Sequence, residues 1–160
     1  MAAPKVTVTV GDGLIKRASF AQVVNQQFVD KIGPLVVSEM KKLIASGRSP
    51  VKGFGRFEPY KNPEKYPGDL KPHRPVNLSL TGTMLSYLSF RKSANNRLEI
   101  GILPEAPQKV KVIARVHNTG ERSDIAKRQF IPEDGEEFVP QIQNMIRDFF
   151  KKRVLEVLKG

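Results

Sequence analysis

The chain has 160 residues, the length of one ordinary domain, and 39% of them are hydrophobic, which is enough for a core. Its 27 Lys and Arg residues outnumber its 16 Asp and Glu residues, so the net charge of +11 favours polyanionic partners such as nucleic acid, or an acidic protein surface. The absence of cysteine excludes disulfides, thiolate metal sites and cysteine nucleophiles.

The sequence carries no recognisable targeting signal. The N-terminus has no basic region followed by an apolar run, and no stretch approaches about 18 apolar residues. We therefore expect no membrane contact, and a location in the cytosol before any assembly step. We expect a single domain over residues 1–160.

The first third of the chain predicts a strand and a long helix. Val and Thr alternate over residues 5–10, which is typical of a strand. Ser19 opens a capping box, and apolar residues at helical spacing follow it. Because Gly33 and Pro34 interrupt this pattern, we expect the helix to kink or divide there, and Gly47 to end its second half.

Residues 48–77 have no sustained periodicity and are rich in proline and glycine, so we interpret them as an extended arm or loop. Their aromatic side chains argue against a mere linker, because such groups need an apolar surface. That surface belongs either to the same domain or to a neighbouring subunit. The residues that we expect in an intersubunit contact are Phe54, Arg56, Phe57, Tyr60 and Tyr66.

Within that stretch, KGFGRF at residues 52–57 is similar to the aromatic signature of an RNA-binding sheet. However, Arg56 occupies the place of the second aromatic residue, Phe57 that of a valine and Pro59 that of the last aromatic residue. We therefore do not expect base stacking. The two glycines should instead supply bends that turn the aromatic side chains toward an apolar surface while the basic residues stay solvated.

The middle of the chain predicts a short helix followed by a hairpin. The helix should start at Ser79 or Thr81. Strands at residues 87–93 and 97–103 should flank a tight Asn-Asn turn, because Asn tolerates the left-handed conformation that such turns need. Residues 108–118 fit either a helix or a strand, and we favour the helix.

The last part of the chain predicts a short strand at residues 128–131 and a long amphipathic helix at residues 134–158. Acidic residues open this helix and basic residues close it, an order that complements the helix dipole. The acidic group could also hold a divalent cation, but the favourable electrostatics of a helix N-terminus are a sufficient explanation for these acidic residues. Its members are Glu133, Asp134, Glu136 and Glu137.

Catalytic patterns are scarce. His73 and His117 have neither metal-ligand nor triad spacing, and KGFGRF lacks the ending of a phosphate-binding loop. We interpret His117 as a hydrogen-bonded residue at a helix end rather than as part of a nuclease motif. We expect neither an enzyme nor a cofactor or metal.

Basic residues interleave with aromatic ones between residues 41 and 71, a pattern that favours phosphate attraction without sequence readout. The candidate DNA-facing residues are Lys41, Lys42, Lys52, Lys61 and Lys65. A nucleic-acid-binding module without sequence specificity is therefore one functional hypothesis.

Several motifs, taken in order, resemble the tail-completion or virion morphogenesis proteins of tailed phages, which act at the head-tail junction. They lie between residues 35 and 158 and read SGRSPVKGFGRFEPYKNPEKYP, RPVNLSLTGTMLSYL, LEIGI, ARVHNTGE and RQFIPEDGEEF, before the closing amphipathic helix. The resemblance implies an α+β fold, with a small antiparallel sheet flanked by helices. The structural motif positions that it carries over are Thr81, Gly82, Leu85, His117, Gly120, Arg128, Phe130 and Pro132.

The same resemblance implies a ring-forming structural protein in the neck or at the upper end of the tail. Its partners would be further copies of itself, neighbouring neck and tail proteins, and DNA contacted without specificity in the lumen. A hexamer would match the symmetry of a tail and a dodecamer that of a portal. The strand at residues 5–10 could extend its own sheet or be donated to a neighbour.

Overall fold

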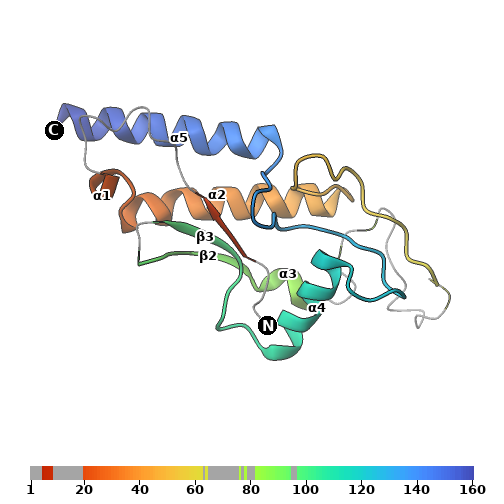
Figure 1. The fold of residues 1–160 in the computed structure, drawn as a ribbon. Helices are drawn as coiled ribbons and strands as arrows, with labels where there is room; N and C mark the ends of the chain where they lie inside the picture. Colours follow the sequence, from red (N-terminus) through yellow and green to blue (C-terminus); the bar gives the residue numbers. More distant parts are fainter. Residues whose placement is uncertain are drawn as a thin grey trace.

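The computed structural model describes residues 5–8, 20–62, 64, 76, 78, 82–94 and 97–160. Three layers follow one another: helix α5 packs on α2, and α2 packs on a small sheet, while α3 and α4 lie near one end of the sheet (Figure 1). The α+β class is confirmed. In chain order the elements are β1 (Lys5–Val8), α1 (Phe20–Val23), α2 (Gln26–Ala45), α3 (Thr83–Ser86), β2 (Leu88–Lys92), β3 (Leu98–Ile102), α4 (Gln108–Thr119) and α5 (Pro140–Lys159).

The sheet is antiparallel throughout and has the order β1-β3-β2. Strand β1 pairs with β3 of the same chain, with Lys5 opposite Gly101. The N-terminal strand therefore extends its own sheet. Strands β2 and β3 form the expected hairpin, and the Asn-Asn turn between them lies outside the described residues.

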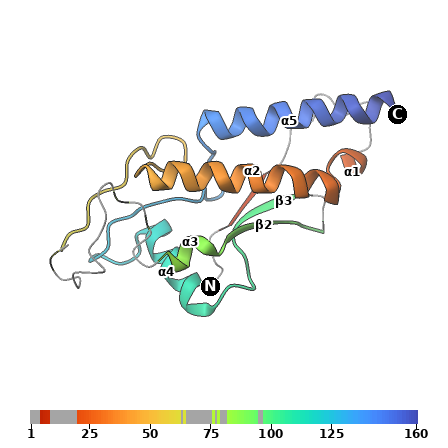
Figure 2. The ribbon, with the colours of Figure 1, turned by 180° about the vertical axis from the view of Figure 1, so that it is seen from behind.

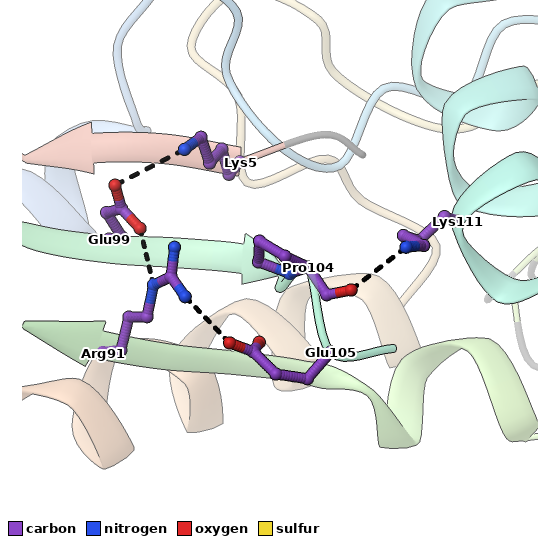
Figure 3. Close-up of polar contacts among 6 residues, drawn as sticks. All are labelled: Lys5, Arg91, Glu99, Pro104, Glu105 and Lys111. Carbon is purple, nitrogen blue, oxygen red and sulfur yellow. Dashed lines mark hydrogen bonds and ion pairs between the residues drawn. The ribbon is translucent and has the colours of Figure 1, made fainter. Parts of the chain in front are cut away.

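The face of the sheet that points away from α2 carries a chain of ion pairs across all three strands (Figure 3). The Glu99 carboxylate receives Arg91 Nε at 2.8 Å and Lys5 Nζ at 3.4 Å, and Arg91 Nη1 reaches Glu105 Oε1 at 2.8 Å. Glu99 is only 9% exposed. The hydrogen bond from Arg91 is the main reason that the pKa of this carboxyl lies below its usual value.

Helix α2 crosses the opposite face of the sheet at close range. A Cβ atom at Gly33 would lie 2.2 Å from the Phe90 ring, so only glycine allows this approach. The helix continues through Pro34, and the expectation that it divides at this point is wrong. The break lies earlier, where Asn25 caps α2 by accepting a hydrogen bond from Phe28 N at 2.9 Å.

Helix α5 completes the core from the far side of α2, and the two helices run side by side in both views (Figure 2). The Phe28 ring of α2 meets Phe149 and Phe150 of α5 edge-on, with centroids 5.5 and 6.2 Å apart. Buried apolar residues from α2, the β2–β3 hairpin, α4 and α5 belong to one hydrophobic cluster. No helix in the described ranges is long and apolar enough to span a membrane.

The hairpin strands and the helix at residues 108–118 were predicted correctly to within one or two residues. A short helix follows the predicted start region, but Ser79 and Thr81 themselves lie outside the described residues, as does Ser19.

The predicted strand at residues 128–131 is wrong. These four residues are all buried and have no strand partner among the described residues. Their amide groups bond to α4 instead: Arg128 N donates to His117 O at 2.7 Å, and the Asn118 side chain accepts from Phe130 N and Ile131 N. The end of α4 and the Asn118 side chain thus supply the hydrogen-bond partners that a neighbouring strand would give this segment.

The last helix begins at Pro140 rather than at residue 134. Gly135 has a positive φ of 84°, and the Glu136 carboxylate accepts the amide of Glu133 at 2.8 Å, so the acidic group forms a turn of its own. Proline at the first helical position is favoured because its missing N–H would be unpaired there in any case. The acidic residues therefore precede the helix and do not complement its dipole from within the first turn.

Candidate functional site

Residues 47–57, here called the clasp loop, form a short hairpin-like loop that two backbone hydrogen bonds close. Phe57 N donates to Gly47 O at 2.9 Å, and Ser49 N donates to Gly55 O at 2.8 Å. Two glycines, Gly53 and Gly55, have φ of 81° and 83°, and a Cβ atom at either would meet no other atom within 4 Å. Backbone conformation alone therefore requires glycine here, as the sequence suggested.

The clasp loop is tied to the segment that precedes α5. Lys52 N donates to Glu137 O and Val139 N donates to Pro50 O, both at 2.8 Å. The Lys52 ammonium also lies 2.6 Å from the Glu137 carboxylate, and this hydrogen bond lowers the pKa of Glu137. Lys52 is thus ion-paired within the chain.

The aromatic residues of the predicted arm that the structure describes pack against their own chain. Phe57 is 6% exposed and belongs to the core, and the half-buried Phe54 ring lies 6.4 Å from it. Tyr60 is half-buried beneath the Arg128 guanidinium, whose carbon is 4.4 Å from the ring centroid. Tyr66 lies outside the described residues. Of the residues predicted to contact a neighbouring subunit, Phe57 packs in the core of its own chain, whereas Arg56 is exposed.

Arg128 holds the chain that leaves the clasp loop. Its side chain is 2% exposed, yet it bonds carbonyl oxygens: Nε donates to Glu58 O and Nη2 to Pro59 O, each at 2.9 Å. The planar guanidinium can reach both carbonyls at once and stack on Tyr60, which lysine could not do.

Asn118 completes the attachment from α4. It is 1% exposed, and its Oδ1 accepts from Phe130 N at 3.0 Å and Ile131 N at 2.9 Å, while Nδ2 donates to Ile131 O at 3.0 Å. The sequence indicated only that Asn118 follows His117 in the ARVHNTGE motif, and its bonds to the 128–131 segment were not predicted. We call the four buried polar residues that connect the clasp loop, α4 and the 128–131 segment the polar node: Ser49, Asn118, Arg128 and Gln129.

His117 borders the polar node without acting as a charged group. Its Nδ1 is buried and has no hydrogen-bond partner, so the predicted side-chain bond is not made by this atom. Burial, and then the charge of Arg128, lower the pKa of His117 from 6.5 to about 4. The ring is therefore neutral at pH 7. It lines a cavity of about 730 Å³ with Tyr60 and Ile113.

The other motif positions also have structural roles. Gly120 ends α4 with a φ of 68°, and a Cβ atom there would lie 2.6 Å from Lys127 Cβ. Gly82 precedes α3 with a φ of 72°, and Phe130 and Pro132 are buried. Leu85 packs partly buried against the core, while Thr81 lies outside the described residues.

The exposed side of the clasp loop carries two arginines directly opposite each other. The Arg48–Arg56 pair lies between the 47–57 and 49–55 hydrogen bonds, so it is a non-hydrogen-bonded pair, in which side chains come closest. Both residues are exposed. Like charges in this arrangement repel, and an anion between them would relieve the repulsion. Arg48 and Arg56 belong to the interleaved basic residues that the sequence indicated, but their pairing was not predicted, because it follows only from the register of the loop.

The predicted DNA-facing lysines that the structure describes have different surroundings. Lys42 pairs with Glu39 at 3.3 Å, and Lys61 donates to the Ser123 carbonyl at 2.8 Å. Lys41 lines a groove between α2 and β2, and Lys52 is paired in the clasp loop, as described above. Lys65 lies outside the described residues.

Within the described part of the chain, no group of three or more His, Asp or Glu residues could hold a metal ion. Comparisons with protein-family models, with curated proteins and with solved structures found no match.

Proposed function

We propose that this chain is a structural virion protein of a tailed phage, a ring-forming neck or tail-terminator component that completes the tail and joins it to the head. It works through surface complementarity between subunits rather than through catalysis. Its partners are further copies of itself, most simply in a hexamer, and the neighbouring neck and tail proteins.

One observation carries this proposal: residues from three of the motifs behind the family resemblance meet in the polar node. Arg128 fixes the chain that leaves the clasp loop, Asn118 fixes the 128–131 segment, and His117 is held neutral in a partly buried position. Buried motif residues of this kind hold the clasp loop, which lies at the surface, in one shape. A fixed surface loop is what a repeated contact in a ring requires, because a mobile loop loses conformational entropy each time it binds.

The Arg48–Arg56 pair adds a contact for DNA. Around a ring, each copy would present two exposed arginine side chains from directly opposite backbone positions to the phosphates of a duplex in the lumen. The same pair supports the second candidate function, a nucleic-acid-binding module without sequence specificity, which would not need a ring.

The oligomeric mass separates the two functions. We expect sedimentation or native mass spectrometry of the protein, alone and with tail components, to show a ring of about six copies of the 17.9-kDa chain. A chain that stays monomeric under both conditions and still binds oligonucleotides would support the second function and contradict the first.

DNA contact by the arginine pair is tested separately. We expect Arg48→Glu with Arg56→Glu to weaken binding to duplex DNA at least tenfold, because two phosphate contacts are lost and reversed in sign. A matched double substitution at the exposed Lys151 and Lys152 of α5 makes the same change in net charge elsewhere. Equal weakening by both variants would show that only net charge matters.

A further inference from the structure

Asp134 and Gly135 occupy the centre of a tight turn in the segment that precedes α5. Glu136 N donates to Glu133 O at 3.0 Å, and Gly135 has a φ of 84° whereas Asp134 has a negative φ. These values define a type II turn, whose third position favours glycine because a side chain there would be strained. Both central residues are exposed, and a Cβ atom at Gly135 would meet nothing within 4 Å. The turn thus lies open to solvent.

The two groups that could react in this turn have no partner among the described residues. The Gly135 amide donates no hydrogen bond there, and the Asp134 carboxylate makes neither a hydrogen bond nor an ion pair. Type I and type II turns share the closing hydrogen bond and differ mainly by a rotation of the central peptide group. This rotation can bring the Gly135 nitrogen toward the Asp134 carboxyl group while the turn stays closed.

The other aspartates in the described ranges lack this arrangement. Asp30 and Asp148 lie inside α2 and α5, where the amide that follows each of them belongs to the helix. Asp124 receives Arg122 through both carboxylate oxygens, at 3.0 and 2.7 Å, and the amide that follows it, Ile125 N, donates to Arg122 O at 3.2 Å. These three aspartates are therefore internal references for the reactivity of Asp134.

We propose that Asp134 is a site of spontaneous backbone isomerisation in the folded chain, and that this modification loosens the clasp loop. The Gly135 nitrogen attacks Cγ of the Asp134 carboxyl group, and the carboxyl OH and the amide proton leave as water. A five-membered succinimide ring results. Water then opens the ring at either of its two carbonyl groups, which returns aspartate or gives isoaspartate. The reaction needs no oxidant and no reactant other than water.

The effect on the clasp loop follows from the place of the turn in the chain. Isoaspartate routes the main chain through the former side chain, so the main chain gains one carbon atom at this position. Shortly after the turn, Glu137 O accepts from Lys52 N and Val139 N donates to Pro50 O, both at 2.8 Å. The added atom shifts these groups relative to the clasp loop and weakens both hydrogen bonds. This effect is independent of whether the chain forms a ring.

The test is incubation of the full, folded chain for several weeks at neutral pH and physiological temperature, followed by peptide mapping for isoaspartate. We expect at least about tenfold more isoaspartate at residue 134 than at Asp30, Asp124 or Asp148, because glycine has no Cβ atom to hinder its nitrogen. The map separates this site from the other Asp-Gly pair, at residues 12–13. Asp134→Glu is the matched control, since it keeps the charge but would have to form a six-membered ring, and it should not isomerise.

Amide hydrogen exchange measures the consequence in the fraction that carries isoaspartate. We expect the amides of Lys52 and Val139 to lose protection at least about threefold, while the amides of α2 keep theirs. The Asp134→Glu chain, incubated in the same way, should show no loss. Isoaspartate at residue 134 no higher than at the three reference aspartates would overturn the proposal. Unchanged protection of Lys52 and Val139 in the isoaspartate fraction would overturn its link to the clasp loop.

Discussion

Two polar networks in this chain each contain an arginine but lie in opposite environments. In the polar node, Arg128 and Asn118 are 2% and 1% exposed, and their side chains bond to backbone groups of residues 58, 59, 130 and 131. On the open face of the sheet, Arg91 and Lys5 have side chains that are 37% and 41% exposed and pair with Glu99. The first network fixes a loop, and the second connects three strands.

The two networks differ in what can pair with the remaining polar groups once one partner has been removed. Water can solvate the partly exposed Lys5 and Arg91 side chains that pair with the buried Glu99, so the net contribution of these pairs to stability is small and falls with salt. Water does not reach the polar node in the same way, and removal of one partner leaves buried donors unpaired. The node should therefore tolerate substitution poorly, while the sheet face tolerates it well.

The largest effect is expected from Asn118→Leu, which keeps the branched shape and the number of heavy atoms but leaves the amides of Phe130 and Ile131 unpaired. We expect a loss of about 2–4 kcal/mol in the free energy of unfolding, measured by urea denaturation. Asn144→Leu on the exposed side of α5 is the control and should change this value by less than about 0.5 kcal/mol. Similar losses in both variants would contradict the special role of the node.

Gly120→Ala should be nearly as costly, because it combines a left-handed φ of 68° with a Cβ contact of 2.6 Å to Lys127. We expect about 2–3 kcal/mol of destabilisation in thermal or urea unfolding. Gly135→Ala has a similar φ of 84° but nothing within 4 Å of the added Cβ, so it should lose only about 1 kcal/mol. The difference between them measures the packing contribution at the end of α4.

His117 makes the polar node sensitive to acid. Its pKa is about 4 in the folded chain and 6.5 ordinarily, so the unfolded state binds a proton first as the pH falls. Stability is full above pH 6.5 and declines from there toward pH 4, by up to about 1.4 kcal/mol per pH unit. His117→Leu should flatten this decline between pH 6.5 and 5. An unchanged slope would mean that the ring is not buried neutral.

Glu99→Gln should have the smallest effect, about 1 kcal/mol at low salt and less at high salt. The pKa of Glu99 is lowered in the fold, so its contribution is present above the ordinary carboxyl pKa of 4.5 and is lost as the pH falls through the folded value. Urea denaturation at two salt concentrations measures both changes. A loss as large as that of Asn118→Leu would remove the contrast between the two networks.

Sequence patterns predicted most elements whose signal is local. The hairpin strands and α4 were found because apolar periodicity and turn residues lie within each segment. The start of α5 was missed because acidic residues suit a helix N-terminus equally well whether or not they lie inside it. The 128–131 segment looks like a strand in isolation, and only the contact with Asn118 shows that α4 takes the place of a strand partner.

The candidate site was predictable only in part, for the same reason. Arg128 and Gly120 were identified as motif positions, but nothing local indicates that Arg128 bonds to residues 58 and 59. Arg48 and Arg56 are eight positions apart and become a close pair through the register of the clasp loop. Such a pair can be identified only when both sides of the turn are known.

Arg128→Lys tests most directly whether the polar node fixes the clasp loop, because it keeps the charge and removes the planar fork. The measurement is amide hydrogen exchange at Ser49, Lys52 and Phe57, whose N–H groups are bonded in the loop and to Glu137. We expect protection at these amides to fall at least tenfold in the variant while the amides of α2 keep theirs. Unchanged protection of the clasp-loop amides would contradict the claim that the polar node fixes this loop.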